Sequence, residues 1–157
     1  MAQREFAVST NAVEWLVKGG ANAGAHLSFS RHWSADAEGL YRLAGRRGEH
    51  SGIREGSFYV GARWWPWGSF SGFYFGAGGM YDRMLDYYGS VYEDTSRTGL
   101  SLRVGYDILL LRHLNLELGI GAWGGQQYRL HDIAELTTES SWFIAPDGIR
   151  AALVYIF

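Results

Sequence analysis

The chain has 157 residues, with 22 glycines, 2 prolines and an aromatic fraction of 16%, a composition that suits a curved sheet better than a helical fold. Its formal net charge of -2 gives no field that would attract a phosphate backbone, which argues against nucleic-acid binding. The absence of cysteine excludes disulfides, thiolate zinc sites and a cysteine nucleophile.

The length fits one domain over residues 1–157, so one architecture must explain the whole chain. No window approaches the roughly 18 consecutive apolar residues of a membrane helix, which excludes a helical span. The opening Met-Ala-Gln-Arg lacks the basic and apolar regions of a signal peptide. We interpret the chain as a mature, exported form with an added Met, its signal peptide absent.

Residues 5–13 and 22–30 are predicted as the first two strands. Residues 33–43 then alternate with a period of two, with one small or apolar face and one largely polar face. The small or apolar face holds Ala35, Ala37, Gly39, Tyr41 and Leu43, and the polar face holds Ser34, Asp36, Glu38 and Arg42. This period of two predicts a strand with one apolar face.

Five further strands follow in the chain. Residues 56–65 and 73–82 carry a weaker signal, whereas residues 100–108, 114–122 and 149–157 alternate clearly. Leu102, Val104, Leu116, Leu118 and Leu153 fall on their apolar faces. The count is about eight strands, with helical spacing in none of the clear ones.

The predicted connections alternate in length. Residues 31–33, 66–72 and 110–113 are short, 44–55, 84–97 and 130–144 are long, and 15–21 is intermediate. Short periplasmic turns and long external loops are typical of outer-membrane barrels, and an even strand number places both termini in the periplasm. We therefore predict an all-β fold, an eight-stranded antiparallel up-and-down transmembrane β-barrel of the bacterial outer membrane, in contact with outer-membrane lipid.

Aromatic residues predict two belts at the membrane interfaces, where a half-buried ring keeps its polar atom wet. The periplasmic belt would hold Trp33, Trp64, Trp65, Trp67, Phe70 and Phe157. The external belt would hold Tyr41, Phe58, Tyr59, Tyr81, Tyr128 and Trp142.

Several short motifs, in this order, resemble an uncharacterised family of Bacteroidota outer-membrane barrels known as a domain of unknown function, of the small OmpA- and OmpX-like kind. They are Thr10-Asn11, Arg31-His32-Trp33-Ser34, Arg63-Trp64-Trp65, Gly72-Phe73-Tyr74-Phe75-Gly76, Arg112-His113-Leu114-Asn115-Leu116-Glu117 and the stretch 151–157. The resemblance covers nearly the whole chain and implies a fold without a defined activity, in proteins often encoded near envelope or fimbrial genes.

The final strand ends in an aromatic residue after alternating apolar positions. Tyr155 and Phe157 resemble the terminal signal read by the barrel-assembly machinery, which we therefore expect as a partner.

If the apolar faces meet lipid, the opposite faces point into the barrel. The predicted interior polar network is His26, Asp36, Glu38, Arg42, Arg63, Arg103, Asp107, Glu117 and Arg150. In so narrow a barrel these charges should pair, and we favour a plug of salt bridges over a proton or ion path.

Gly119 to Gly124 matches a dinucleotide fingerprint by letter, but a strand runs through it where the fingerprint needs a helix. We interpret its inward glycines as space for large neighbours such as Arg103 and Trp123. His131, Asp132 and Ser140 could form a hydrolytic triad, or pair with His50 to hold a metal ion. Neither a nucleophile-elbow motif nor a metal-ligand spacing accompanies them.

The long loops hold acidic and aromatic residues, among them Asp86, Glu93, Tyr92 and Trp142, that suit an envelope protein, a glycan or divalent cations. We expect a structural or interaction protein that displays these loops, as a subunit of an envelope or fimbrial assembly. We expect no cofactor and no enzymatic activity. Two alternatives stay open: a soluble lipocalin-like calyx for a small apolar ligand, which would bury the apolar faces, and an outer-membrane lipid-modifying enzyme.

Overall fold

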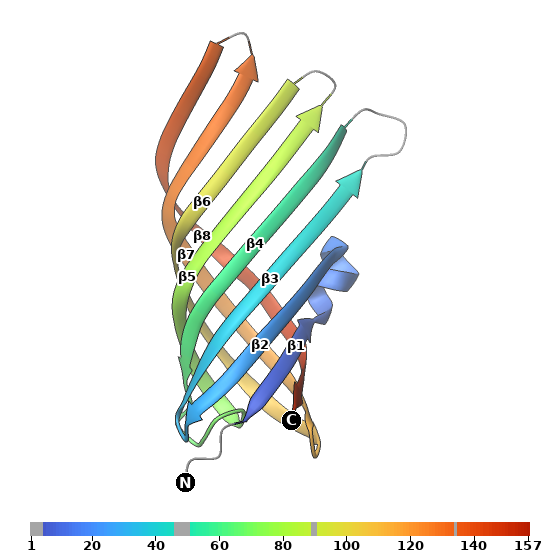
Figure 1. The fold of residues 1–157 in the computed structure, drawn as a ribbon, viewed down its shortest axis with the longest axis vertical. Helices are drawn as coiled ribbons and strands as arrows, with labels where there is room; N and C mark the ends of the chain where they lie inside the picture. Colours follow the sequence, from blue (N-terminus) through green and yellow to red (C-terminus); the bar gives the residue numbers. More distant parts are fainter. Residues whose placement is uncertain (1–4, 46–50, 89–90, 134) are drawn as a thin grey trace.

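Eight antiparallel strands make up the fold, in a computed structural model that describes residues 5–45, 51–88, 91–133 and 135–157 (Figure 1). The strands and one π-helical turn are β1 (Phe6–Asn11), η1 (Glu14–Lys18), β2 (Gly20–Ser30), β3 (Trp33–Gly45), β4 (Ser51–Trp64), β5 (Gly72–Tyr88), β6 (Val91–Leu111), β7 (Leu114–Ile133) and β8 (Glu135–Ile156). The predicted all-β class with eight strands is confirmed.

The strands are hydrogen-bonded in sequence order, and β8 returns to β1 to complete a ring. The closing ladder is short, because it joins only Ala7–Asn11 of β1 to Ala152–Ile156 of β8. Phe157 donates its backbone N–H to the Phe6 carbonyl at 2.9 Å. The start of β1 and the end of β8 therefore lie at the same end of the ring, drawn lowest in Figure 1.

The predicted short turns are confirmed at this lower end, between β2 and β3, β4 and β5, and β6 and β7. The prediction of long loops at the other end was wrong for most of the residues concerned. β5 and β6 pair from Gly72↔Asp107 up to Tyr88↔Val91, and β7 and β8 pair up to Ile133↔Glu135. Strands thus take up most of the predicted loops 84–97 and 130–144 and about half of the predicted loop 44–55. The remaining residues of these loops, 46–50, 89–90 and 134, lie outside the described residues.

β1 ends at Asn11 rather than at residue 13, because side chains replace the backbone ladder there. Asn11 N–H donates to Asn22 Oδ1 at 2.6 Å, and Asn22 Nδ2 donates to the Asn11 carbonyl at 2.9 Å. The chain then turns into η1, which ends at Gly19 in a left-handed conformation with φ 66°. The predicted connection 15–21 therefore contains a π-helical turn.

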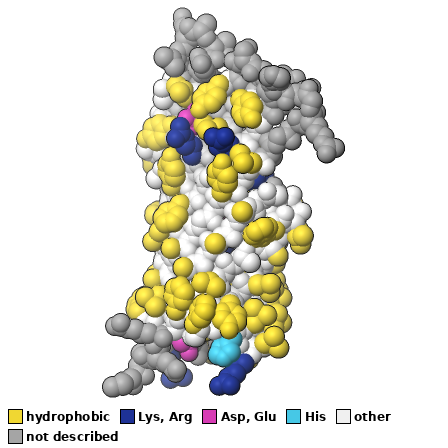
Figure 2. Space-filling view, turned by 45° about the vertical axis from the view of Figure 1, so that its right-hand side comes forward, with side chains coloured by type: hydrophobic (Ala, Val, Ile, Leu, Met, Phe, Trp, Pro, Cys, Tyr) yellow, Lys and Arg dark blue, Asp and Glu magenta, His cyan; other side chains and the backbone are white. Residues whose placement is uncertain are grey.

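The two faces of the ring differ in chemistry. Leu102 is 67% exposed on the outer face, whereas Glu117 and Arg63 inside the ring are 0% and 1% exposed. Figure 2 shows apolar side chains spread over the outer surface, with charged ones gathered toward the two ends. In the part of the chain that the structure describes, no helix is both long and apolar enough to span a membrane.

The apolar core sits inside the lower mouth of the ring. It consists of Ala7, Trp65, Phe70, Tyr74 and Val154. Trp65 and Phe70 lie at the two ends of the β4–β5 turn, and both side chains point inward. The belt prediction was therefore wrong for Trp65, Phe70 and likewise for the buried Tyr59, although the other belt residues are exposed on the outer face.

Candidate functional site

Arg63 of β4 is the centre of a buried ion network. Its Nε lies 2.7 Å from Asp36 Oδ2, and its Nη1 lies 2.6 Å from Glu117 Oε2. Its Nη2 donates to Glu38 Oε1 at 3.0 Å. One guanidinium therefore joins carboxylates from β3 and β7 across the interior of the ring.

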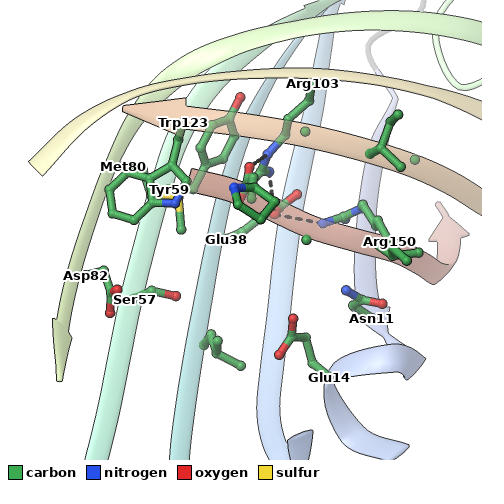
Figure 3. Close-up of a pocket in the computed structure, with 18 of the residues that line it drawn as sticks. Asn11, Glu14, Glu38, Ser57, Tyr59, Met80, Asp82, Arg103, Trp123 and Arg150 are labelled. Carbon is green, nitrogen blue, oxygen red and sulfur yellow. Dashed lines mark hydrogen bonds and ion pairs between the residues drawn. The ribbon is translucent and has the colours of Figure 1, made fainter. Parts of the chain in front are cut away.

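Glu38 of β3 is the second centre, and Figure 3 shows two arginines converging on it. Arg103 Nη1 and Arg150 Nη1 lie 2.7 Å and 2.8 Å from Glu38 Oε2. Arg150 also pairs with Glu117, and Arg103 Nε lies 2.5 Å from Asp147 Oδ2. These contacts tie β6 and β8 to β3, so the network braces the ring across its diameter.

His26 extends the network to β1. Its Nδ1 lies 2.7 Å from Asp36 Oδ1 and its Nε2 lies 2.7 Å from Ser9 Oγ. Arg150 Nη2 donates to the same Ser9 hydroxyl at 3.2 Å. The imidazole is therefore held on both nitrogens.

Two tyrosines cover the arginines. Tyr74 donates its hydroxyl to Glu117 Oε1 at 2.8 Å, and its ring lies 4.5 Å from the Arg63 guanidinium. The Arg103 guanidinium lies 3.6 Å from the centre of the Tyr59 ring. Stacking of this kind is favourable where water is excluded.

Inward glycines leave room for these large side chains, as predicted from the sequence. A Cβ at Gly119 would lie 2.7 Å from Tyr74 Oη, and one at Gly121 would lie 3.0 Å from Arg103 Cγ. The Gly119–Gly124 stretch is the middle of β7 and continues as a strand. It lacks the helix that a dinucleotide fingerprint requires.

Of the nine residues predicted for the interior, Arg42 lies apart from this network. It pairs with Glu55 at 2.6 Å farther up the strands. His26, Asp36, Glu38, Arg63, Arg103, Glu117 and Arg150 share the contacts described above. Asp107 is buried opposite Glu117 in the β6–β7 ladder and forms no ion pair with a described residue.

Replacing Asp107 by asparagine is expected to raise the free energy of unfolding by about 1–3 kcal/mol, because it removes a buried carboxylate that has no counterion. Urea unfolding of the folded protein followed by tryptophan fluorescence measures it. Glu117→Gln is the matched control on the facing strand. It should lower the same free energy by about 3–5 kcal/mol, because Glu117 balances two arginines. Equal signs for the two variants would contradict this charge assignment.

Sequence reasoning missed several interior residues. Tyr59 and Tyr74 alternate with exposed neighbours, so strand parity could have found them. Asp147 had no such signal, because a bulge opposite Gly121 and Ala122 shifts the phase of β8 and points its side chain inward. The pair Arg97–Asp82 and Ser101, which donates to Asp147 at 2.7 Å, were also missed.

A cavity of about 190 Å³ lies beside the network, on the side of η1, and Figure 3 draws residues that line it. Its wall combines network residues with Leu40, Met80, Trp123 and Glu14 of η1. The lower mouth is filled by Trp65 and Phe70, where Trp65 Nε1 donates to Ser34 Oγ at 3.0 Å. The interior is therefore a cup with a packed floor.

Exposed ion pairs follow the strands above the cavity. Arg83 binds Asp94 through two hydrogen bonds, of 2.8 Å and 3.2 Å, and Arg129 lies 3.0 Å from Glu93. The hydrogen bonds and charge of Asp94 raise the pKa of the Arg83 guanidinium above its usual value. These pairs join neighbouring strands and stabilise the β5–β6 and β6–β7 ladders in the upper part of the ring.

Of the other candidate residues, the structure describes the side chain of Ser140 alone. Ser140 is exposed near the top of β8, the side chains of His131 and Asp132 are not described, and His50 lies outside the described residues. Among the described residues, no three His, Asp or Glu side chains form a cluster that could hold a metal ion. Tyr155 and Phe157 are half-exposed or more at the lower end, with ring centres 5.0 Å apart.

A family model described as "Protein of unknown function (DUF3575)" matches residues 1–157. No curated protein matches the chain.

Proposed function

This chain belongs to the DUF3575 family of proteins of unknown function, and we propose that it is an eight-stranded transmembrane β-barrel of the bacterial outer membrane, a sealed scaffold that presents β-hairpins to an envelope partner. The observation that carries this proposal is the inverted distribution of its side chains. Arg63, Asp36 and Glu117 are buried inside the ring, while leucines and isoleucines cover the outside. In lipid this arrangement is favourable, and in water it would expose the apolar outer face.

The length of the apolar zone supports a membrane crossing. On the outer face of β7, Leu114, Leu116, Leu118, Ile120 and Ala122 are followed by Gln126. A tilted strand crosses the hydrocarbon core with about 9–11 residues. The lower half of β7 matches that span, and its upper half would stand outside the membrane.

The contents of the ring support a structural role in place of a pore. Arginine–carboxylate pairs occupy the middle of the bore and aromatic rings fill its lower mouth. An eight-stranded barrel has an interior that side chains can fill. We therefore keep the plug interpretation over the ion path.

The calyx alternative requires the apolar faces of the strands to point into the ring and the charged faces to point outward. It would place Leu102 and Leu118 around a ligand, yet these are 67% and 43% exposed on the outside. The lipid-modifying enzyme lacks support from geometry, since of its candidate side chains only Ser140 is described, at the exposed rim.

The residues expected to contact a partner lie mostly on paired strands and not in long loops. The upper parts of β3–β8 rise beyond η1 in Figure 1 and carry tyrosines and ion pairs in ordered ladders. Side chains on a ladder lose less conformational entropy on binding than the same side chains on a loop. This is the surface that we propose faces a partner.

Heat modifiability tests the membrane assignment. We expect the chain to aggregate without detergent, to refold into detergent micelles, and to migrate differently on a gel when unboiled than when boiled. The shift arises because a closed transmembrane barrel resists dodecyl sulfate until it is heated. A soluble monomer with no shift would overturn the assignment and direct the work to ligand screening of a calyx.

Planar-bilayer recordings test the sealed scaffold separately. The refolded protein is expected to give no stable conductance above the protein-free membrane. Reproducible channel steps would favour the ion path through the same residues.

A further inference from the structure

The cavity beside the ion network lies at a gap in the wall of the ring. Above its short ladder with β1, which begins at Ala152, β8 pairs with β7 alone among the described strands. On the other side of this gap β1 has ended and the chain has turned into η1 (Figure 1). Both borders of the gap line the cavity, through Asn11 and Glu14 on one side and residues 146–150 on the other. Because aromatic rings fill the lower mouth, a ligand would enter the cavity from this side.

The wall of this cavity carries more carboxylates than cationic groups. The described residues that line it include five carboxylates and three arginines. Each of these arginines already has a carboxylate partner. Arg97 pairs with Asp82, and both Arg103 and Arg150 pair with Glu38. The arginines are therefore engaged, and the excess of negative charge favours a cation over an anion as the ligand.

Asp82 of β5 supplies an acceptor that no described residue uses. The residue is 2% exposed, and its Oδ2 pairs with Arg97. The Arg97 guanidinium is itself held over the Trp123 ring, 4.9 Å from the ring centre. Asp82 Oδ1 is buried and has no hydrogen-bond partner among the described residues. A buried carboxylate oxygen without a donor costs free energy, which an N–H group of a ligand would recover.

A pair on the outer face of the same two strands gives a direct comparison. Arg83 donates to both carboxylate oxygens of Asp94, at 3.2 Å and 2.8 Å. The outer pair therefore satisfies its carboxylate, whereas the inner pair leaves one oxygen of Asp82 over. The unused acceptor is a property of the cavity and not of every arginine–aspartate pair on the β5–β6 ladder.

The rest of the wall fits a short apolar body. Leu40, Met80 and Trp123 line the cavity, and Figure 3 shows Asp82 and Ser57 next to each other at one side of it. Ser57 faces Asp82 in the β4–β5 ladder, so a hydroxyl oxygen accompanies the carboxylate. The volume of about 190 Å³ holds about six water molecules at roughly 30 Å³ each. A molecule with about six non-hydrogen atoms would therefore fit.

We propose that this cavity binds a small aliphatic amine, whose ammonium group donates to Asp82 Oδ1 and Ser57 Oγ while its methylene chain lies against Met80 and Trp123. An ammonium has three donors and no acceptor, which matches a wall with an excess of acceptors. A metal ion fits less well, because no three His, Asp or Glu side chains cluster in the described part of the chain. The inference goes beyond the proposed scaffold role, and it holds whether or not the outer face of the ring contacts lipid.

Diaminobutane is the probe for this site, and uncharged butanediol of the same length is its matched control. Isothermal titration calorimetry measures both with the refolded full chain in an uncharged detergent, at about 0.15 M salt so that surface charges are screened. We expect diaminobutane to bind with a Kd of about 1 mM or below, at least about tenfold more tightly than butanediol. Equal affinities of the two probes, or no binding of diaminobutane, would overturn the proposal.

Substitutions then locate the site. Asp82→Asn removes the carboxylate charge and should weaken diaminobutane binding at least about tenfold. Asp94→Asn is the matched control on the outer face, and it should change the affinity by no more than about twofold. Equal losses for the two variants would contradict the assignment to the cavity.

Met80→Trp provides an independent test, because Asp82→Asn also deprives Arg97 of its partner. The larger side chain fills the cavity without removing a charge, so diaminobutane binding should be lost. Circular dichroism checks that each variant retains its strands. A folded Met80→Trp protein that binds diaminobutane as tightly as the parent chain would rule out this cavity as the site.

Discussion

Replacing Arg63 by methionine is expected to lower the free energy of unfolding by about 3–5 kcal/mol. Arg63 is 1% exposed and pairs with Asp36, Glu38 and Glu117, so its removal leaves three buried carboxylates with fewer counterions. Methionine keeps the length of the side chain, which limits the added cavity. The measurement is equilibrium unfolding in urea of the refolded protein.

Arg129→Met is the control for this result. Arg129 pairs with Glu93 at 3.0 Å, but both side chains are about 40% exposed, at 43% and 40%. An exposed pair contributes within about 1 kcal/mol. Similar losses for the two variants would contradict the view that the interior network stabilises the ring.

Replacing Trp65 by alanine is the second large effect that we expect, with a loss of about 3–5 kcal/mol. Trp65 is fully buried against Phe70 and Tyr74, with ring centres 5.7 Å and 5.1 Å away, and its loss also leaves Ser34 without its indole partner. The same urea experiment measures it.

Trp67→Ala provides the comparison, since Trp67 belongs to the same turn but is 60% exposed. We expect a change below about 1 kcal/mol there. If both tryptophan variants lose stability equally, the lower mouth is not the packed floor described above.

The sequence predicted the lower halves of the strands well, because each has one face toward an apolar outside and one toward a polar interior. Leu114 to Ala122 shows this alternation clearly. Above the apolar zone both faces of a strand are polar, as in β6 between Tyr92 and Thr98, and no alternation remains to be recognised. The strands in that region were therefore predicted as loops.

The candidate site was predictable where parity holds. Asp36, Glu38 and Arg63 follow directly from alternation with exposed neighbours. Asp147 does not, because Pro-Asp-Gly indicates a turn and the bulge breaks the phase. Trp65 continues the inward parity of Arg63, but its place beside Trp64 suggested a shared belt. Which arginine binds which carboxylate depends on strand register, which composition does not determine.

The short β1–β8 ladder has a consequence for the order of folding. Hairpins such as β5–β6 and β7–β8 join residues close in sequence and can form early, whereas the closing ladder must bring Ala7 to Ile156 across nearly the whole chain. Such a distant contact carries a large loop-closure entropy and few hydrogen bonds to offset it. Closure should therefore be the late, slow step of folding, and a folding intermediate would be an open sheet with both terminal strands unpaired at their outer edges.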